Sequence, residues 1–106
     1  MLFDKHTINI DATILELINR RRRQVLVHSY LYYKCDTNII SDFTFDSWCK
    51  QLVQLHNEHP RETTKAVFPK AFEGWCGFSG YDLFNNDYEA EEWAQRKALQ
   101  LTRTSL

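Results

Sequence analysis

The sequence predicts a mainly α, single-domain protein with an αα-hairpin, a loop segment rich in aromatic residues and glycine, and a C-terminal helix. Apolar residues recur at helical spacing within 11–59, which should form the hairpin, and again within 86–102. Residues 61–85, between these regions, contain all three glycines and several large aromatic side chains. A chain of 106 residues can bury one hydrophobic core, so we expect residues 1–106 to form one domain.

The first helix is predicted from Asp11 to about Lys34. Asp11 can cap its N-terminus, and four residues nearly superimpose at helical periodicity: Ile14, Ile18, Val25 and Tyr32. The run Arg20–Arg23 wraps all faces of one turn, so at least one guanidinium must extend to the surface, pair with an acid or mark a break. We interpret the run as a solvated turn with one structural ion pair. A phosphate or nucleic-acid patch is the alternative.

The second helix is predicted from Ser41 or Asp42 to about Glu58. Either of the first two residues can cap a helix whose apolar side chains follow the i, i+3, i+4, i+7 pattern: Phe45, Trp48, Cys49, Leu52, Val53 and Leu55. It should end at Glu58 because His59 precedes Pro60, whose ring disfavours a helical conformation of the preceding residue. The short connector between the two helices favours an antiparallel αα-hairpin.

The segment 61–85 is predicted to be loop-rich. Glycine permits tight turns there, and Trp75, Phe78 and Tyr81 carry apolar surface that we expect to pack on the hairpin. A lid or a partner-binding loop is the alternative. Asn86 and Glu89 have the spacing of a capping box, which predicts a final helix over 86–102.

Composition and charge argue against several classes of protein. A formal charge of −1 gives no overall attraction to nucleic acid or to an anionic membrane, so we expect neither partner. The chain has no apolar run long enough for a membrane span and no signal-peptide pattern, which predicts a soluble, cytoplasmic protein. Three cysteines without CxxC spacing predict free thiols. Zinc binding by His56 and His59 with Cys49 or Cys76 is a minor alternative, and no metal is expected.

The residues that can form a binding site lie where the two hairpin helices meet. Asp42, Phe45 and Asp46 project from one face of the second helix, and Tyr32 and Tyr33 at the end of the first can bring a ring opposite them. Aromatic walls with carboxylates at the rim suit a flat ligand that is cationic or carries amide or ribose groups. The alternative is that the aromatic residues form the core and the acids are helix caps. An acid/base pair for glycosidic cleavage is a minor third interpretation.

The stretch from His28 to Pro60 carries a distinctive set of residues: His28-Ser-Tyr30-Leu-Tyr32-Tyr33, Asp36, Ile40-Ser41-Asp42-x-x-Phe45-Asp46, Leu52, Leu55 and His59-Pro60. The set resembles the small N-terminal domain of bacterial NAD-dependent DNA ligases. The resemblance implies a helical domain that grips the nicotinamide mononucleotide (NMN) half of NAD. It also implies the ligand-binding residues, with Tyr32 and Phe45 around the nicotinamide ring and two aspartates on its polar groups: His28, Tyr32, Tyr33, Asp42, Phe45 and Asp46.

Two positions depart from the family pattern. Phe45 stands where the family has Tyr, which keeps a stacking face and loses a hydroxyl. Tyr33 stands where the family commonly has a His near the phosphate. We therefore expect weak binding of the nucleotide.

These features predict a stand-alone, non-catalytic module that binds NAD or NMN. No catalytic residue is assigned, because the family's adenylation domain and its nucleophilic lysine are missing from this chain. The alternative is a protein-interaction module, such as one encoded by a phage, that binds and inhibits or regulates a host enzyme such as an NAD-dependent ligase or another nucleic-acid enzyme. An open slot at Tyr32 and Phe45 would favour the nucleotide, whereas a slot filled by Trp75 or Phe78 would favour the protein partner.

Overall fold

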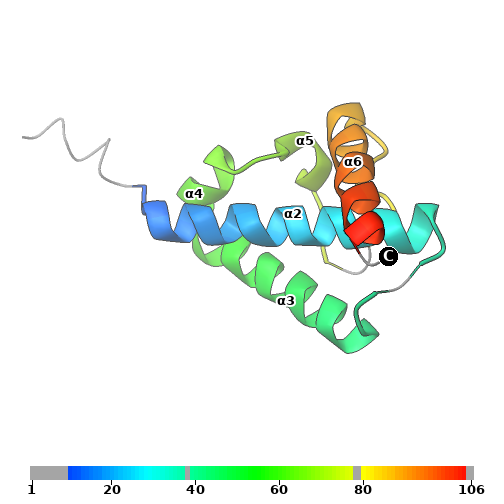
Figure 1. Ribbon diagram of the computed structural model, residues 1–106. Helices are drawn as coiled ribbons and strands as arrows, with labels where there is room; N and C mark the ends of the chain where they lie inside the picture. Colours follow the sequence, from blue (N-terminus) through cyan, green and yellow to red (C-terminus); the bar gives the residue numbers. More distant parts are fainter. Residues whose placement is uncertain (1–9, 38, 78–79, 105–106) are drawn as a thin grey trace, which may run out of the picture.

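The computed structural model describes residues 10–37, 39–77 and 80–104, and this part of the chain is helical without strands (Figure 1). Its helices, in chain order, are α2 (Ala12–Lys34), α3 (Asp42–Glu58), α4 (Pro60–Lys65), α5 (Pro69–Phe72) and α6 (Tyr88–Thr104). The long helix α2 is the axis on which α3, α4 and α6 pack. The predicted mainly α fold is confirmed.

Helix α2 has the predicted bounds. The Asp11 side chain accepts hydrogen bonds from the backbone N–H groups of Thr13, at 2.9 Å, and Ile14, at 3.2 Å. At the other end Asp36 has a φ of 52°, a left-handed conformation that aspartate tolerates, and the Thr37 N–H returns to the Leu31 carbonyl at 2.9 Å. The helix therefore stops where the hairpin must turn.

Helix α3 runs back along α2 as the second arm of the predicted hairpin (Figure 1). Ser41 is its N-cap and accepts a hydrogen bond from the Thr44 N–H at 3.1 Å. The helix ends at Glu58, and Pro60 then occupies the first turn of α4, where its missing N–H costs no hydrogen bond. The predicted hairpin and its two helices are confirmed.

Two short helices, α4 and α5, lie in or next to the segment that the sequence predicts to be loop-rich. Each begins with a proline whose fixed φ favours a first helical turn. They are too short to show an apolar periodicity, which is why the sequence pattern missed them. Helix α4 is joined to the start of α2, because the buried carboxylate of Glu62 accepts a hydrogen bond from the Asp11 N–H at 2.6 Å.

Helix α6 crosses α2 at a steep angle (Figure 1). Its buried face is a stripe of small residues, Ala90, Ala94 and Ala98, which lets the two backbones approach closely. Asp87, rather than the predicted Asn86, caps the helix: its carboxylate accepts a hydrogen bond from the Ala90 N–H at 3.0 Å. Asp87 is buried and Asn86 is exposed, so tertiary packing selects Asp87 as the capping residue.

The hydrophobic core is built on α2 and is closed by residues from α3, α5 and α6, together with Ala66 directly after α4. Its largest fully buried aliphatic side chains are Ile18, Val25, Leu26, Leu31, Leu52 and Leu83. Trp75 packs against this core as predicted, whereas Tyr81 remains 66% exposed. Phe78 lies outside the described residues. No helix in the described part of the chain has the length and apolar character needed to cross a bilayer.

Gly80 lies against α2 with no room for a side chain. A Cβ at this position would overlap the side chain of Ser29, which is itself fully buried. We predict that Gly80→Ala lowers the free energy of unfolding by about 1–3 kcal/mol, because the helix or the loop must move to relieve the overlap. Urea unfolding measures the change. A Gly80→Ala variant as stable as the parent would show that this contact is looser than the structure indicates.

The matched variant is Ser29→Ala, which keeps the Cβ and removes only the hydroxyl. The Ser29 Oγ is buried without a hydrogen-bond partner among the described residues. Removing an unsatisfied buried polar group should leave stability unchanged or raise it.

Candidate functional site

The hairpin turn brings the two halves of the predicted site to one end of the molecule. The last turns of α2 carry Tyr32 and Tyr33, and the first turns of α3 carry Asp42, Phe45 and Asp46. The αL residue after α2 and the Ser41 cap before α3 fix both ends of the connector between them. Local capping thus sets where α2 ends and α3 begins, and so places both groups of side chains at the hairpin turn.

The two tyrosines form a small aromatic cluster with a third residue. The rings of Tyr32 and Tyr33 meet edge to face at 4.7 Å between centroids, and Tyr33 meets Tyr81 in the same way at 5.4 Å. Tyr32 is 50% exposed, so much of its ring remains open to a ligand. Tyr81 was not predicted as a site residue. The sequence feature that could have pointed to Tyr81 is its place among the aromatic residues of the glycine-containing segment 61–85.

The residues from α3 divide between surface and core. Asp42 and Asp46 are exposed, whereas Phe45 is partly buried and packs against the core cluster. Phe45 has no ring contact with Tyr32 or Tyr33 among the described residues. The structure therefore places these residues at the same end of the hairpin without stacking their rings on one another.

His28 lies apart from the tyrosine cluster. Its ring meets the edge of Trp48 on α3 at 5.4 Å, and it lines a cavity of about 460 Å³ between α2 and α6. Burial lowers the pKa of His28. Its contacts are those of a residue that supports the packing of α2, although it belongs to the predicted ligand set.

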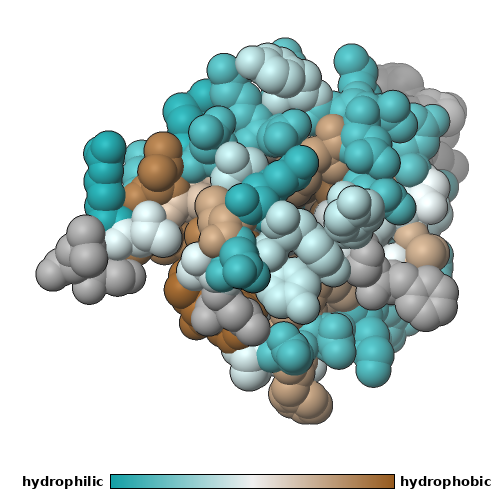
Figure 2. Space-filling view, turned by 90° about the vertical axis from the view of Figure 1, so that its right-hand side faces the viewer, coloured by the Kyte–Doolittle hydropathy of each residue, from teal (hydrophilic) through white to brown (hydrophobic). Residues whose placement is uncertain are grey.

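Large apolar side chains are exposed close to this end of the hairpin. Ile39 and Phe43 are 47% and 79% exposed, and Tyr81 adds to the same surface through its contact with Tyr33. Figure 2 views the molecule from the side of the hairpin turn and shows apolar residues lying between hydrophilic ones. The surface around the site is therefore mixed in character.

The prediction of a structural ion pair in the run Arg20–Arg23 is wrong, because the buried arginine is bonded to neutral groups. Arg22 is 3% exposed, and its partners are neutral: Nε donates to Nε2 of His56 at 3.1 Å, and Nη1 donates to the carbonyl of Val67 at 2.7 Å. The guanidinium also lies over the ring of Phe72, 4.9 Å from its centroid. Arg21 is likewise bonded to neutral groups, the side-chain amides of two glutamines. The helix stays unbroken because uncharged acceptors bind two of the three guanidinium nitrogens, Nε and Nη1.

Burial sets the ionisation of this cluster. Desolvation lowers the pKa of Arg22 to about 10. Burial, followed by the positive charge of Arg22, lowers the pKa of His56 to about 4. His56 is therefore neutral at physiological pH, as its role as an acceptor from Arg22 requires. The described residues contain no group of three His, Cys, Asp or Glu side chains arranged to bind a metal.

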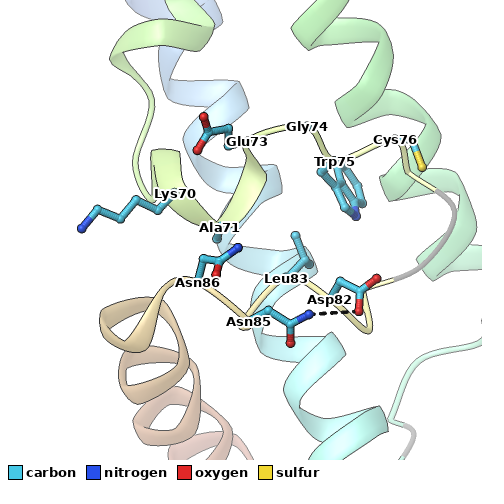
Figure 3. Close-up of a pocket in the computed structure, with 10 residues that line it drawn as sticks. All are labelled: Lys70, Ala71, Glu73, Gly74, Trp75, Cys76, Asp82, Leu83, Asn85 and Asn86. Carbon is cyan, nitrogen blue, oxygen red and sulfur yellow. Dashed lines mark hydrogen bonds between the residues drawn. The ribbon is translucent and has the colours of Figure 1, made fainter.

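A second cavity, of about 330 Å³, opens between α5 and the turn that precedes α6 (Figure 3). Trp75 and Leu83 form its apolar wall, and the Asn85 side-chain amide donates to Asp82 at 3.2 Å. The Trp75 ring contacts Phe72 at 5.2 Å and His56 at 6.5 Å. Trp75 is therefore held between this cavity and the Arg22 cluster.

The three cysteines are free thiols, as predicted. Cys35 and Cys76 are exposed, and Cys49 is buried in α3. Burial, with a further contribution from the charge of Asp46, raises the pKa of Cys49 to about 12. Since the thiolate is the reactive form, Cys49 is a packing residue at neutral pH.

The fold and this arrangement define a small helical module whose hairpin turn carries exposed tyrosine and aspartate side chains. Residues 11–66, slightly more than half of the chain, match the family described as the DNA ligase-like, N-terminal NAD+-binding domain. The chain belongs to this family. The matched range contains the whole hairpin and α4, and the segment from α5 to α6 lies beyond it.

Three bacterial proteins, each described as a DNA ligase, are similar to the chain. The one from Acidobacterium capsulatum is 29% identical over 96 residues, which cover 80% of this chain and 14% of the ligase. Those from Flavobacterium johnsoniae and Cytophaga hutchinsonii are 43% and 38% identical over 47 and 50 residues, which cover 7% and 8% of those ligases. The chain thus spans only a small part of the relatives it matches. No solved structure matches it.

The low pKa of His56 predicts a pH-dependent stability. Below pH 6.5, the ordinary pKa of histidine, the unfolded chain binds a proton that the folded chain resists until about pH 4. We expect the free energy of unfolding to be fully present above pH 6.5 and to fall by roughly 3 kcal/mol as the pH drops to about 4. Urea unfolding at several pH values measures this slope.

The control variant is His56→Gln, whose amide can still accept a hydrogen bond from Arg22 but does not titrate. Its stability should change less between pH 6.5 and 4, with a remaining slope in the same direction from His28. An unchanged slope in His56→Gln would mean that other groups cause the acid sensitivity.

Proposed function

We propose that this domain binds a nicotinamide nucleotide, NAD or NMN, at the hairpin turn. The observation that carries the proposal is the family match over residues 11–66, a range that includes every residue of the predicted ligand set. Tyr32 at the end of α2 and the two aspartates at the start of α3 are all exposed, which supports it. The nucleotide is a proposal for this chain, drawn from the family to which it belongs.

The chemistry of the exposed groups suits nicotinamide. Its pyridinium ring is flat and cationic in NAD and NMN, and a tyrosine face attracts a cation by roughly 0.5–2 kcal/mol. The open part of the Tyr32 ring provides such a face. Asp42 and Asp46 can accept hydrogen bonds from the carboxamide N–H groups or from ribose hydroxyls. Phe45, partly buried below them, would form the apolar floor or opposite wall of the site.

The neighbouring cluster would hold Tyr32 in place. Tyr33 contacts both Tyr32 and Tyr81, so rings from two distant parts of the sequence brace the binding face. Because Tyr33 stands where the family commonly has a His near the phosphate, the proposed site gains an aromatic brace and lacks that contact. We therefore propose an affinity on the order of micromolar to millimolar.

The proposed role is non-catalytic. The chain matches 7–14% of the length of the ligases to which it is similar, and the family region is the small N-terminal domain alone. Asp42 and Asp46 are exposed on one helix, and catalysis would need a further group placed to activate a nucleophile. We propose that they orient a bound nucleotide.

A ligand that binds only the folded state raises its stability, so NMN or NAD at several millimolar should raise the melting temperature. We expect Asp46→Asn and Tyr32→Leu each to weaken binding about tenfold, because each removes one of the proposed ligand contacts. Titration calorimetry with NMN measures the affinity.

The control is Glu58→Gln, which removes one negative charge at the far end of α3. Its affinity should equal that of the parent. Absence of both a thermal shift and a binding heat with NMN and with NAD would contradict the proposed function.

We also expect no turnover of NAD. Purified protein incubated with NAD should release no nicotinamide, ADP-ribose or AMP when the mixture is followed by chromatography. Cleavage of the glycosidic bond would need a positioned water or nucleophile in addition to a carboxylate. Product that increases with protein concentration and disappears in Asp42→Asn would show that the module is an enzyme.

The protein-interaction alternative stays a prediction from the sequence. The exposed Tyr32, Ile39, Phe43 and Tyr81 are the residues through which a protein partner would contact this end of the hairpin.

A further inference from the structure

A third cavity, of about 450 Å³, lies on the side of α2 that faces α4 and α5. None of the residues predicted to bind the nucleotide lines it. Along α2, Arg22 and Tyr32 are separated by about 15 Å at the helical rise per residue. The cavity is therefore separate from the proposed nicotinamide site. Its walls are formed by Arg22, Thr63, Thr64, Pro69, Lys70, Phe72, Glu73 and Gly74.

Arg22 lines this cavity, and its guanidinium has no carboxylate partner among the described residues. Nε and Nη1 donate to neutral acceptors, and Nη2 has no hydrogen bond to a described residue. In the described part of the chain, the one fully buried side-chain polar atom without a hydrogen-bond partner is Ser29 Oγ. Nη2 of Arg22 also lacks a partner, so it is not fully buried and still reaches solvent. The cavity that Arg22 lines provides this access. A largely buried cation with an unused N–H donor is stabilised when an anion binds to it.

The other polar groups on the wall show which ligand the cavity would accept. The hydroxyls of Thr63 and Thr64 already donate to backbone carbonyls, at 2.8 and 2.7 Å, and so are not available as donors. Lys70 is exposed and forms no ion pair with a described residue. Glu73 is the one acid on this wall, and Figure 3 shows that its side chain and that of Lys70 do not point toward each other. The donors for a ligand are Nη2 of Arg22 and the ammonium of Lys70.

We propose that this cavity binds a phosphate group between Arg22 and Lys70. Nη2 presents two N–H donors as a fork in the fixed plane of the guanidinium, which suits phosphate oxygens, and the two cations balance a dianion. The ring of Phe72, below the guanidinium, and the bonds to His56 and Val67 hold the plane of the fork before the ligand arrives. Glu73 opposes the anion and sets an upper limit on its affinity.

The test uses inorganic phosphate as the probe, with ionic strength held constant by sodium chloride. We expect the melting temperature to rise with phosphate and to saturate, and the Nε–Hε resonance of Arg22 to shift in NMR spectra over the same concentrations. Lys70→Gln should weaken the apparent affinity about tenfold, because one charge-assisted contact is lost. Glu73→Gln should strengthen it. Both residues are exposed, so neither change should prevent folding.

Three controls decide the outcome. Lys50→Gln removes an exposed lysine of α3 that does not line the cavity, and should leave the phosphate response unchanged. Asp46→Asn should also leave it unchanged, which separates this site from the proposed function. Acetate at the same ionic strength should have no effect.

The proposal is overturned by a phosphate response that does not saturate, or by one that Lys50→Gln and Lys70→Gln reduce equally. An equal response to acetate would overturn the assignment to phosphate. If Glu73→Gln lowers stability and does not strengthen the phosphate response, Glu73 is itself the counter-charge of Arg22, and the cavity is not an anion site.

Discussion

The guanidinium of Arg22 connects three segments of the chain inside the protein. It projects from the middle of α2, donates to His56 near the end of α3, donates to the carbonyl of Val67 between α4 and α5, and covers the ring of Phe72 in α5. Each contact joins residues more than thirty positions apart in the sequence. Because a buried cation is costly when it loses its acceptors, these segments must fit together around it.

The elements that the sequence predicted well are those whose signals are local. Asp11 and Ser41 cap helices through bonds to residues two or three positions away, and proline ends α3 by steric exclusion. The cap of α6 was misplaced by one residue, because Asn86 and Asp87 are both good caps and only packing distinguishes them. The short helix α4 packs on α2, and α5 meets α2 through the contact of Phe72 with Arg22; no window of sequence contains these contacts.

For the candidate site, the sequence predicted which residues share the hairpin end, since the register of two helices and a short turn determines it. It did not predict which of them are packed. Phe45 and His28 are partly buried against the core and Trp48, while Tyr32 and both aspartates remain exposed. The neutral environment of Arg22 was equally hidden, because His56 and Val67 approach it only through tertiary structure.

The contact of Gly80 with Ser29 shows that the packed domain extends beyond residues 11–66, the range of the family match. Gly80 packs against Ser29, which lies three residues before Tyr32 in α2. Tyr81, which follows Gly80, contacts the ring of Tyr33. The part of the chain outside residues 11–66 therefore forms the back of the tyrosine cluster. A ligand that orders Tyr32 and Tyr33 would therefore slow the local opening of Gly80 and Tyr81, although it touches neither Gly80 nor α6.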